Sequence, residues 1–384
     1  MTQPSARSGK NRDIQFLRGI AILMVVVHHY ANRLPGPKWY TDSFSYTGLW
    51  GGVDLFFAIS GYVISKSLLD RHPNLADARL SASEMIQFWI KRVFRLLPSA
   101  WLWLAIPTIL SPFFVHTGGM QIDQVLRGAA SAFFIYSNFY WEYCVRFSLM
   151  GTSCPWPDAN GVYWSLSAEE QFYIVLSSVL LFTRLRYLLL VALPLAFGIW
   201  LIPSIAAWHW HLRYESLVTG VAVYAFSRTS VYAKFSAWFS NRMVRRALIL
   251  GCCVGIALAK GIAPGHEILF LTVLATASVA LGTVDGAFEN SRMGLAIGWM
   301  GDRAYSIYLS HLTVYLIARE ALIRLGFEQY WSSGSFALIV FPVVFVAVLL
   351  LGDASHRFVD KPTTEFGKRL AAAHRGIRRE SARV

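Results

Sequence analysis

An arginine and a histidine lie within the first apolar stretch of the chain, which runs from Asp13 to Tyr30. Arg18 and His29 are 11 positions apart, so a helix would place them about 20° apart around its axis and about 16 Å apart along it. Charged and titratable side chains inside a membrane helix are costly, so they are functional candidates by default. Taken alone, Arg18 also fits a snorkelling anchor and His29 a packing residue. His28 points about 80° away and is the weaker candidate of the adjacent histidines.

Four more polar groups interrupt apolar stretches further along the chain. They are Asp54 and Ser60 in residues 51–61, Arg92 and Arg95 in residues 88–98, Glu169 and Glu170 in residues 163–173, and Tyr305 and His311 in residues 302–311. Arg92 and Arg95 share one helix face, which suits the binding of an anionic group through paired N–H donors as well as a cytoplasmic boundary. Asp54 can instead cap the second apolar helix. Ser167 and Glu170 have the spacing of a capping box, which would leave Glu169 freer for chemistry.

Together these segments resemble the membrane-bound acyltransferase 3 family, the O-acyltransferases that modify bacterial surface glycans and some small molecules. The resemblance extends from Arg18 to about Pro362 and keeps the order of the family. It includes the Arg-x10-His element, the GVDLFF..SG segment, the Arg-x-x-Arg pair, the WSLS.E..FY segment and the YS.YL.H segment. Residues 358–362 are similar to the family's "EKP" end, with Asp360 where the family often has Glu.

The resemblance implies acetyl-coenzyme A, or another acyl-coenzyme A, as a donor that binds from the cytoplasm. Its phosphates would be held by three arginines: Arg18, Arg92 and Arg95. His29 would act as a general base or as a transient acyl carrier, with Glu169 or Asp54 orienting its ring. We assign Ser60, Tyr305 and His311 to substrate binding, although His311 fits a core histidine equally well.

Composition places the chain among membrane proteins. Of its 384 residues 55% are hydrophobic and only 15% charged, with a mean hydropathy of +0.45, which is typical of a polytopic helical protein. The net charge of +13 would suggest nucleic acid binding in a soluble protein. Here the basic residues cluster between apolar stretches, so the positive-inside rule explains them and we expect no nucleic acid partner.

Hydrophobic runs predict an all-α bundle of about ten membrane spans. They lie at Ile14–Ala31, Val53–Leu69, Ser99–Val115, Val162–Thr183, Tyr187–Pro203, Leu212–Ser227, Ala247–Ile262, Glu267–Val284, Ala304–Ile323 and Ser335–Leu351. Ten spans put every basic loop and both termini in the cytoplasm. An eleventh span at Val125–Tyr140 would break that agreement, so we predict a re-entrant or interfacial segment there.

One domain is expected over residues 1–366, followed by a basic cytoplasmic tail, 367–384, that either lies on anionic lipid or is disordered. Cys144 and Cys154 flank a loop that we place outside, where a disulfide can persist. We expect no cleavable signal peptide and no fused extracytoplasmic domain. The run Trp208–His211 alternates faces on a helix, so an interfacial aromatic belt explains it better than a metal site, and no metal is expected.

The predicted function is therefore transfer of an acyl group, most simply acetyl, from a cytoplasmic donor to a hydroxyl of a cell-surface or lipid-linked glycan. The predicted location is the inner membrane of a bacterium. A small acceptor such as a macrolide is one alternative. A transporter or flippase that uses the same buried charges is another, although no inverted repeat is visible in the sequence.

Overall fold

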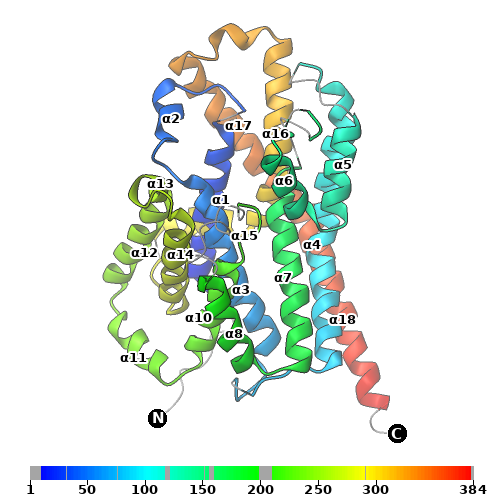
Figure 1. Ribbon diagram of the computed structural model, residues 1–384, viewed down its shortest axis with the longest axis vertical. Helices are drawn as coiled ribbons and strands as arrows, with labels where there is room; N and C mark the ends of the chain where they lie inside the picture. Colours follow the sequence, from blue (N-terminus) through cyan, green and yellow to red (C-terminus); the bar gives the residue numbers. More distant parts are fainter. Residues whose placement is uncertain are drawn as a thin grey trace.

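The computed structural model describes residues 10–381 except 32, 76, 117–121, 151, 155–159, 199–209 and 290. Within this part of the chain the secondary structure is helical and no strand forms (Figure 1). The all-α fold class predicted from the hydrophobic runs is therefore confirmed.

Each predicted span coincides with a helix over most of its length. These helices are α1 (Arg12–Tyr30), α3 (Gly52–Leu69), α4 (Ala82–Leu110), α7 (Tyr163–Phe182), α8 (Leu185–Gly198), α10 (Glu215–Ser227), α12 (Arg242–Ala257) with α13 (Ala259–Ile262), α14 (Glu267–Thr283), α16 (Ala304–Arg324) and α17 (Gly334–Ser355). The end of the predicted span Tyr187–Pro203 lies outside the described residues. Among the described residues, three segments qualify as spans by length and apolar composition: Leu49–Leu69, Ala82–Phe113 and Gly334–His374. The count of ten thus stays a prediction.

Small residues let helices approach closely around α1 and α3. A side chain at Gly19 of α1 would meet the backbone oxygen of Ile297, in α15 (Arg292–Asp302), at 2.0 Å. Gly61 of α3 faces Leu217 of α10 in the same way, also at 2.0 Å. Glycine at such positions allows backbone-to-backbone packing that any larger residue would prevent. The first crossing brings the Arg18 end of α1 against the junction of α15 with α16.

The predicted re-entrant segment is a broken pair of helices, α5 (Ile122–Phe133) and α6 (Ser137–Arg146). The break includes Ile135, whose φ of +60° is left-handed and ends a helix. Side chains of α7 satisfy the exposed backbone: the Gln171 amide donates to the Ile135 carbonyl at 2.7 Å, and the Ser167 hydroxyl accepts from the Ser137 N–H at 3.2 Å. The segment therefore packs on α7, and its depth in the membrane stays a prediction.

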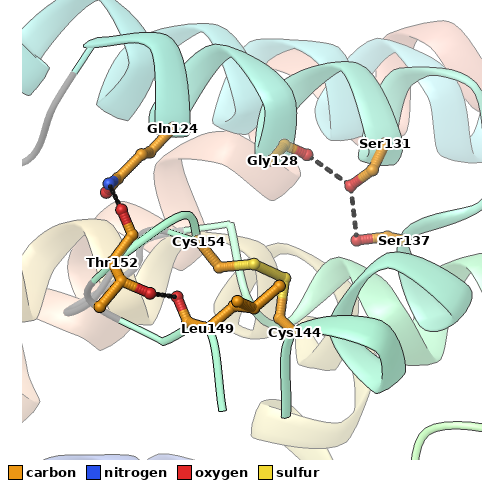
Figure 2. Close-up of a disulfide and its surroundings, with 8 residues drawn as sticks. All are labelled: Gln124, Gly128, Ser131, Ser137, Cys144, Leu149, Thr152 and Cys154. Carbon is orange, nitrogen blue, oxygen red and sulfur yellow. Dashed lines mark hydrogen bonds between the residues drawn. A yellow bond between two sulfur atoms is a disulfide. The ribbon is translucent and has the colours of Figure 1, made fainter. Parts of the chain in front are cut away.

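A disulfide joins Cys144 of α6 to Cys154 (Figure 2). Gln124 of α5 donates a hydrogen bond to the Thr152 carbonyl at 2.6 Å, beside the bridge. The bridge that the sequence left open is therefore present, and this hydrogen bond connects its loop to α5.

The predicted capping box at Ser167 and Glu170 is wrong. The helix already begins at Tyr163, so both residues lie in its interior, where Ser167 contacts α6 and Glu170 is buried. A capping box does form at the start of α4, where Ser81 and Glu84 satisfy each other's backbone N–H groups.

The C-terminal helices close the bundle beside α4. After α17 the chain makes a π-helical turn, His356–Asp360, and continues as α18, Lys361–Ser381. Asp360 accepts hydrogen bonds from Ser99 of α4 and Ser306 of α16, so the acid of the "EKP"-like end joins three helices. In Figure 1, α18 lies beside the lower part of α4. It is helical across residues 366 and 367, the expected tail boundary, and residues 382–384 of the tail lie outside the described part.

Candidate active site

A cavity of about 120 Å³ lies between α1, α3, α4, α7, α15 and α16. Six of the nine residues singled out from the sequence line it: Arg18, Ser60, Arg92, Arg95, Glu169 and Tyr305. They come from five helices, because each of these helices turns its polar residues toward the same interior space. The other three, His29, Asp54 and His311, do not line it.

Positive charge dominates the wall of the cavity. Arg18, Arg92 and Arg95 face two carboxylates, Glu169 and Asp302, and Asp302 is already paired with Lys10 at 2.7 Å. Arg95 is exposed, so the cavity opens to the surface beside it. Clustered guanidinium groups in a cleft attract anions and bind phosphate oxygens through paired N–H donors.

Glu169 is the centre of a hydrogen-bond network inside the cavity. It accepts from the Ser60 hydroxyl at 2.8 Å, from the Arg92 guanidinium at 3.1 Å and from the Tyr173 hydroxyl. The Arg92 guanidinium also lies 4.0 Å from the centre of the Tyr173 ring. Glu169 therefore holds Arg92 in place, and its partners do not include His29.

Asp54 forms a buried ion pair with Arg213, with 2.9 Å between the charged atoms and both side chains 1% exposed. Three tryptophans surround the guanidinium, with ring centres at 4.9 to 5.3 Å: Trp50, Trp164 and Trp210. Asp54 is thus neither a simple helix cap nor a partner of His29. The sequence analysis missed Arg213, although an arginine inside a predicted span is the same signal that selected Arg18.

His29 instead contacts His311. The Nδ1 atom of His29 lies 3.2 Å from Nε2 of His311 and 3.0 Å from the Val25 carbonyl oxygen. His311 is fully buried, and its own Nδ1 lies 2.7 Å from the Tyr308 carbonyl oxygen. The two histidines, which the sequence assigned to different roles, form one pair.

Tyr308 lies between this pair and the cavity. It lines the cavity one helical turn before His311, and its hydroxyl lies 2.5 Å from the Ser165 hydroxyl and 3.1 Å from the Val162 carbonyl oxygen. Tyr305, one turn earlier, donates to the Leu96 carbonyl at 2.7 Å. Tyr308 and Ser165 are within the segments YS.YL.H and WSLS.E..FY, but sequence reasoning did not single them out.

A second histidine contact explains part of the Trp208–His211 run. His211 lies 3.0 Å from a carboxylate oxygen of Glu142, in α6, whereas Trp208 and His209 fall outside the described residues. Across the part of the chain that is described, no group of three or more His, Cys, Asp or Glu side chains is arranged to hold a metal ion.

Comparison with known proteins supports the family that the motifs resemble. The family model of the acyltransferase domain matches residues 11–353. The chain is 25% identical over 378 residues to the peptidoglycan O-acetyltransferase OatA of Listeria monocytogenes, covering 92% of this chain and 56% of that protein. It is 26% identical over 380 residues to a Bacillus subtilis protein named "Putative peptidoglycan O-acetyltransferase YrhL", covering 92% of this chain and 55% of that protein.

The chain spans about half the length of the curated relatives that it matches. No solved structure matches it. The family match nevertheless covers the cavity, the histidine pair and nearly every helix described above. The chain therefore belongs to the membrane-bound acyltransferase 3 family that its ordered motifs resemble.

Proposed function

We propose that the protein is an integral-membrane O-acetyltransferase that takes the acetyl group from acetyl-coenzyme A and transfers it to a hydroxyl of a cell-surface glycan. The observation that carries this proposal is the arginine-lined cavity, whose inner wall at Tyr308 backs onto the His29–His311 pair. One part of the protein can thus bind an anionic donor while the other supplies a basic nitrogen.

The donor is held by its phosphates. Arg18 and Arg95 make no hydrogen bond or ion pair among the described residues, so their donors are free for an anionic ligand, whereas Arg92 is shared with Glu169. The pantetheine arm would extend along α1 from Arg18 toward His29, a distance of about 16 Å on a helix. Tyr308 and its partner Ser165 stand in this path, so their side chains must give way for the thioester to arrive.

The transfer itself needs a base and a proton return. In the general-base route His29 removes the proton of the acceptor hydroxyl, and the oxygen attacks the thioester carbonyl. The carbon–sulfur bond breaks, and the coenzyme A thiolate takes the proton back from His29. In the acyl-carrier route His29 attacks the thioester carbonyl, the carbon–sulfur bond breaks and coenzyme A leaves as its thiolate. The hydroxyl oxygen then takes the acetyl group from the ring nitrogen, and the hydroxyl proton goes to the thiolate.

Peptidoglycan is the first acceptor to test, because the Listeria relative is named a peptidoglycan O-acetyltransferase and the Bacillus relative a putative one. An exopolysaccharide or a lipopolysaccharide would also be a cell-surface glycan, but the names of these relatives do not point to either. The proposed location is the bacterial inner membrane with both termini in the cytoplasm, since this places the exposed Arg95 on the side where acetyl-coenzyme A is made.

Purified protein in lipid nanodiscs, supplied with acetyl-coenzyme A and soluble peptidoglycan fragments, tests the proposal. Wild-type protein should release coenzyme A and add an acetyl group to the glycan, which raises the mass of the glycan by about 42 units. His29→Ala should lower the rate by about 10²- to 10⁴-fold, whereas His28→Ala is the matched control and should stay near wild type. No release above background from wild type would reject the proposed transfer and favour the flippase. Equal, substantial release from wild type and His29→Ala would reject only the role of His29.

A further inference from the structure

Two backbone carbonyls determine where the protons of the histidine pair lie. The Nδ1 atom of His311 is 2.7 Å from the Tyr308 carbonyl oxygen. A carbonyl oxygen only accepts hydrogen bonds, so this Nδ1 must carry the proton of the neutral ring. The Nε2 atom of His311 is then unprotonated and carries a lone pair, and it faces His29.

The same reasoning applies to His29. Its Nδ1 lies 3.0 Å from the Val25 carbonyl oxygen and 3.2 Å from His311 Nε2, which carries a lone pair. Both neighbours are acceptors, so the shared atom is satisfied only as a donor. A neutral His29 therefore carries its proton on Nδ1, and its Nε2 holds the free lone pair.

We propose that His311 is a positioning residue for His29, and not the substrate-binding residue that the sequence suggested. It holds the His29 ring through Nδ1–H and keeps Nε2 as the atom that takes the acceptor's proton. This inference rests on the proposed function, because it concerns the same transfer.

The proton of the acceptor hydroxyl enters and leaves through a single atom, Nε2 of His29. When Nε2 of His29 accepts the hydroxyl proton, the ring becomes a cation whose Nδ1–H still donates to Val25 and His311. The proton leaves again from Nε2 to the coenzyme A thiolate. The surroundings keep His311 itself in place, because its ring lies 5.7 Å from that of Tyr315, whose hydroxyl donates to the Val26 carbonyl at 2.8 Å.

Three substitutions of His311 separate positioning from packing. His311→Ala and His311→Phe remove the lone pair, and the second keeps an aromatic ring in the space. His311→Gln restores an acceptor oxygen near the place of Nε2. Ser310→Ala is the matched control, since Ser310 is equally buried on α16 and its hydroxyl donates to the Ile307 carbonyl of its own helix.

Coenzyme A release with peptidoglycan fragments as the acceptor gives kcat and the KM for acetyl-coenzyme A. The Ala and Phe variants should lose about 10- to 100-fold in kcat, a part of the general-base contribution, with KM within about two-fold because the donor cavity is intact. The Gln variant should recover at least about ten-fold over Ala. Equal rates for Gln and Ala, or a Phe variant near wild type, would overturn the positioning role. If Phe does not fold, the Gln–Ala comparison decides.

A second measurement reads the proton position without turnover. Solid-state nitrogen-15 spectra of histidine-labelled protein distinguish protonated from bare ring nitrogens. The signals that disappear in His29→Ala belong to His29. In the wild-type protein at neutral pH these signals should show a protonated Nδ1 and an unprotonated Nε2. The opposite tautomer would overturn the inference. Failure of the proposed function is distinct from both results, since it leaves wild type and His29→Ala equally inactive.

Discussion

The Asp54–Arg213 pair offers a quantitative test of how the site is built. Replacing Asp54 with Asn keeps the shape of the side chain and removes its charge, which leaves the guanidinium of Arg213 buried at 1% exposure without its ion-pair partner. Removing one partner of a buried ion pair costs about 3–5 kcal/mol. The three tryptophans soften this cost through their contacts with the cation but cannot replace a carboxylate.

The expected shift of the melting temperature follows from chain length. An unfolding entropy of about 2.1 cal/mol/K per residue over the chain makes 3–5 kcal/mol equivalent to a decrease of about 4–6 °C. Asp54→Asn combined with Arg213→Met removes both charges, so it should recover much of the loss. The assay is the loss of monodisperse protein on heating, read by size-exclusion chromatography in detergent.

An exposed pair provides the control for this experiment. Lys66 and Asp70 lie 3.3 Å apart with side chains 53% and 44% exposed, so Asp70→Asn should cost no more than about 1 kcal/mol. A shift for Asp54→Asn no larger than that of Asp70→Asn would refute the reasoning. The reasoning would also be refuted if the double variant lost as much stability as Asp54→Asn and Arg213→Met lose when their separate effects are added.

Three further predictions concern the cavity and the topology. Arg95→Ala should weaken coenzyme A binding about ten-fold or more in a calorimetric titration. Arg95→Lys should restore binding only partly, because a lysine lacks the planar pair of donors with which arginine binds a phosphate. Unchanged affinity in both variants would mean that Arg95 only marks the cytoplasmic boundary of the helix. Glu169→Gln should tighten coenzyme A binding about five-fold, since it removes one negative charge beside the arginines and the nearer of the two carboxylates at Arg92, a gain of roughly 1 kcal/mol; weaker binding would contradict this electrostatic reasoning. After reduction, a membrane-impermeant thiol reagent applied to intact cells should label the Cys144–Cys154 loop and not a cysteine placed at Ser381, and the reverse pattern would mean that a span is miscounted.

The amino-acid sequence alone was enough to predict the properties that depend on neighbours along one helix. Apolar runs predicted the helices, and the first run, which carries Arg18 and His29, is one continuous helix, α1. The polar residues inside those runs identified six side chains that line the cavity. These predictions succeeded because helical periodicity and the cost of a polar group in an apolar run are local quantities.

The pairing of the polar side chains was decided only by the tertiary structure. Asp54 pairs with Arg213, 159 positions away, and His29 with His311, 282 positions away. Helix periodicity orients a side chain around its own axis but does not say which other helix lies opposite. That choice follows from close packing at glycines such as Gly19 and Gly61. The sequence thus identifies the polar residues inside the helices, and the packing of the helices decides which of these residues contact one another.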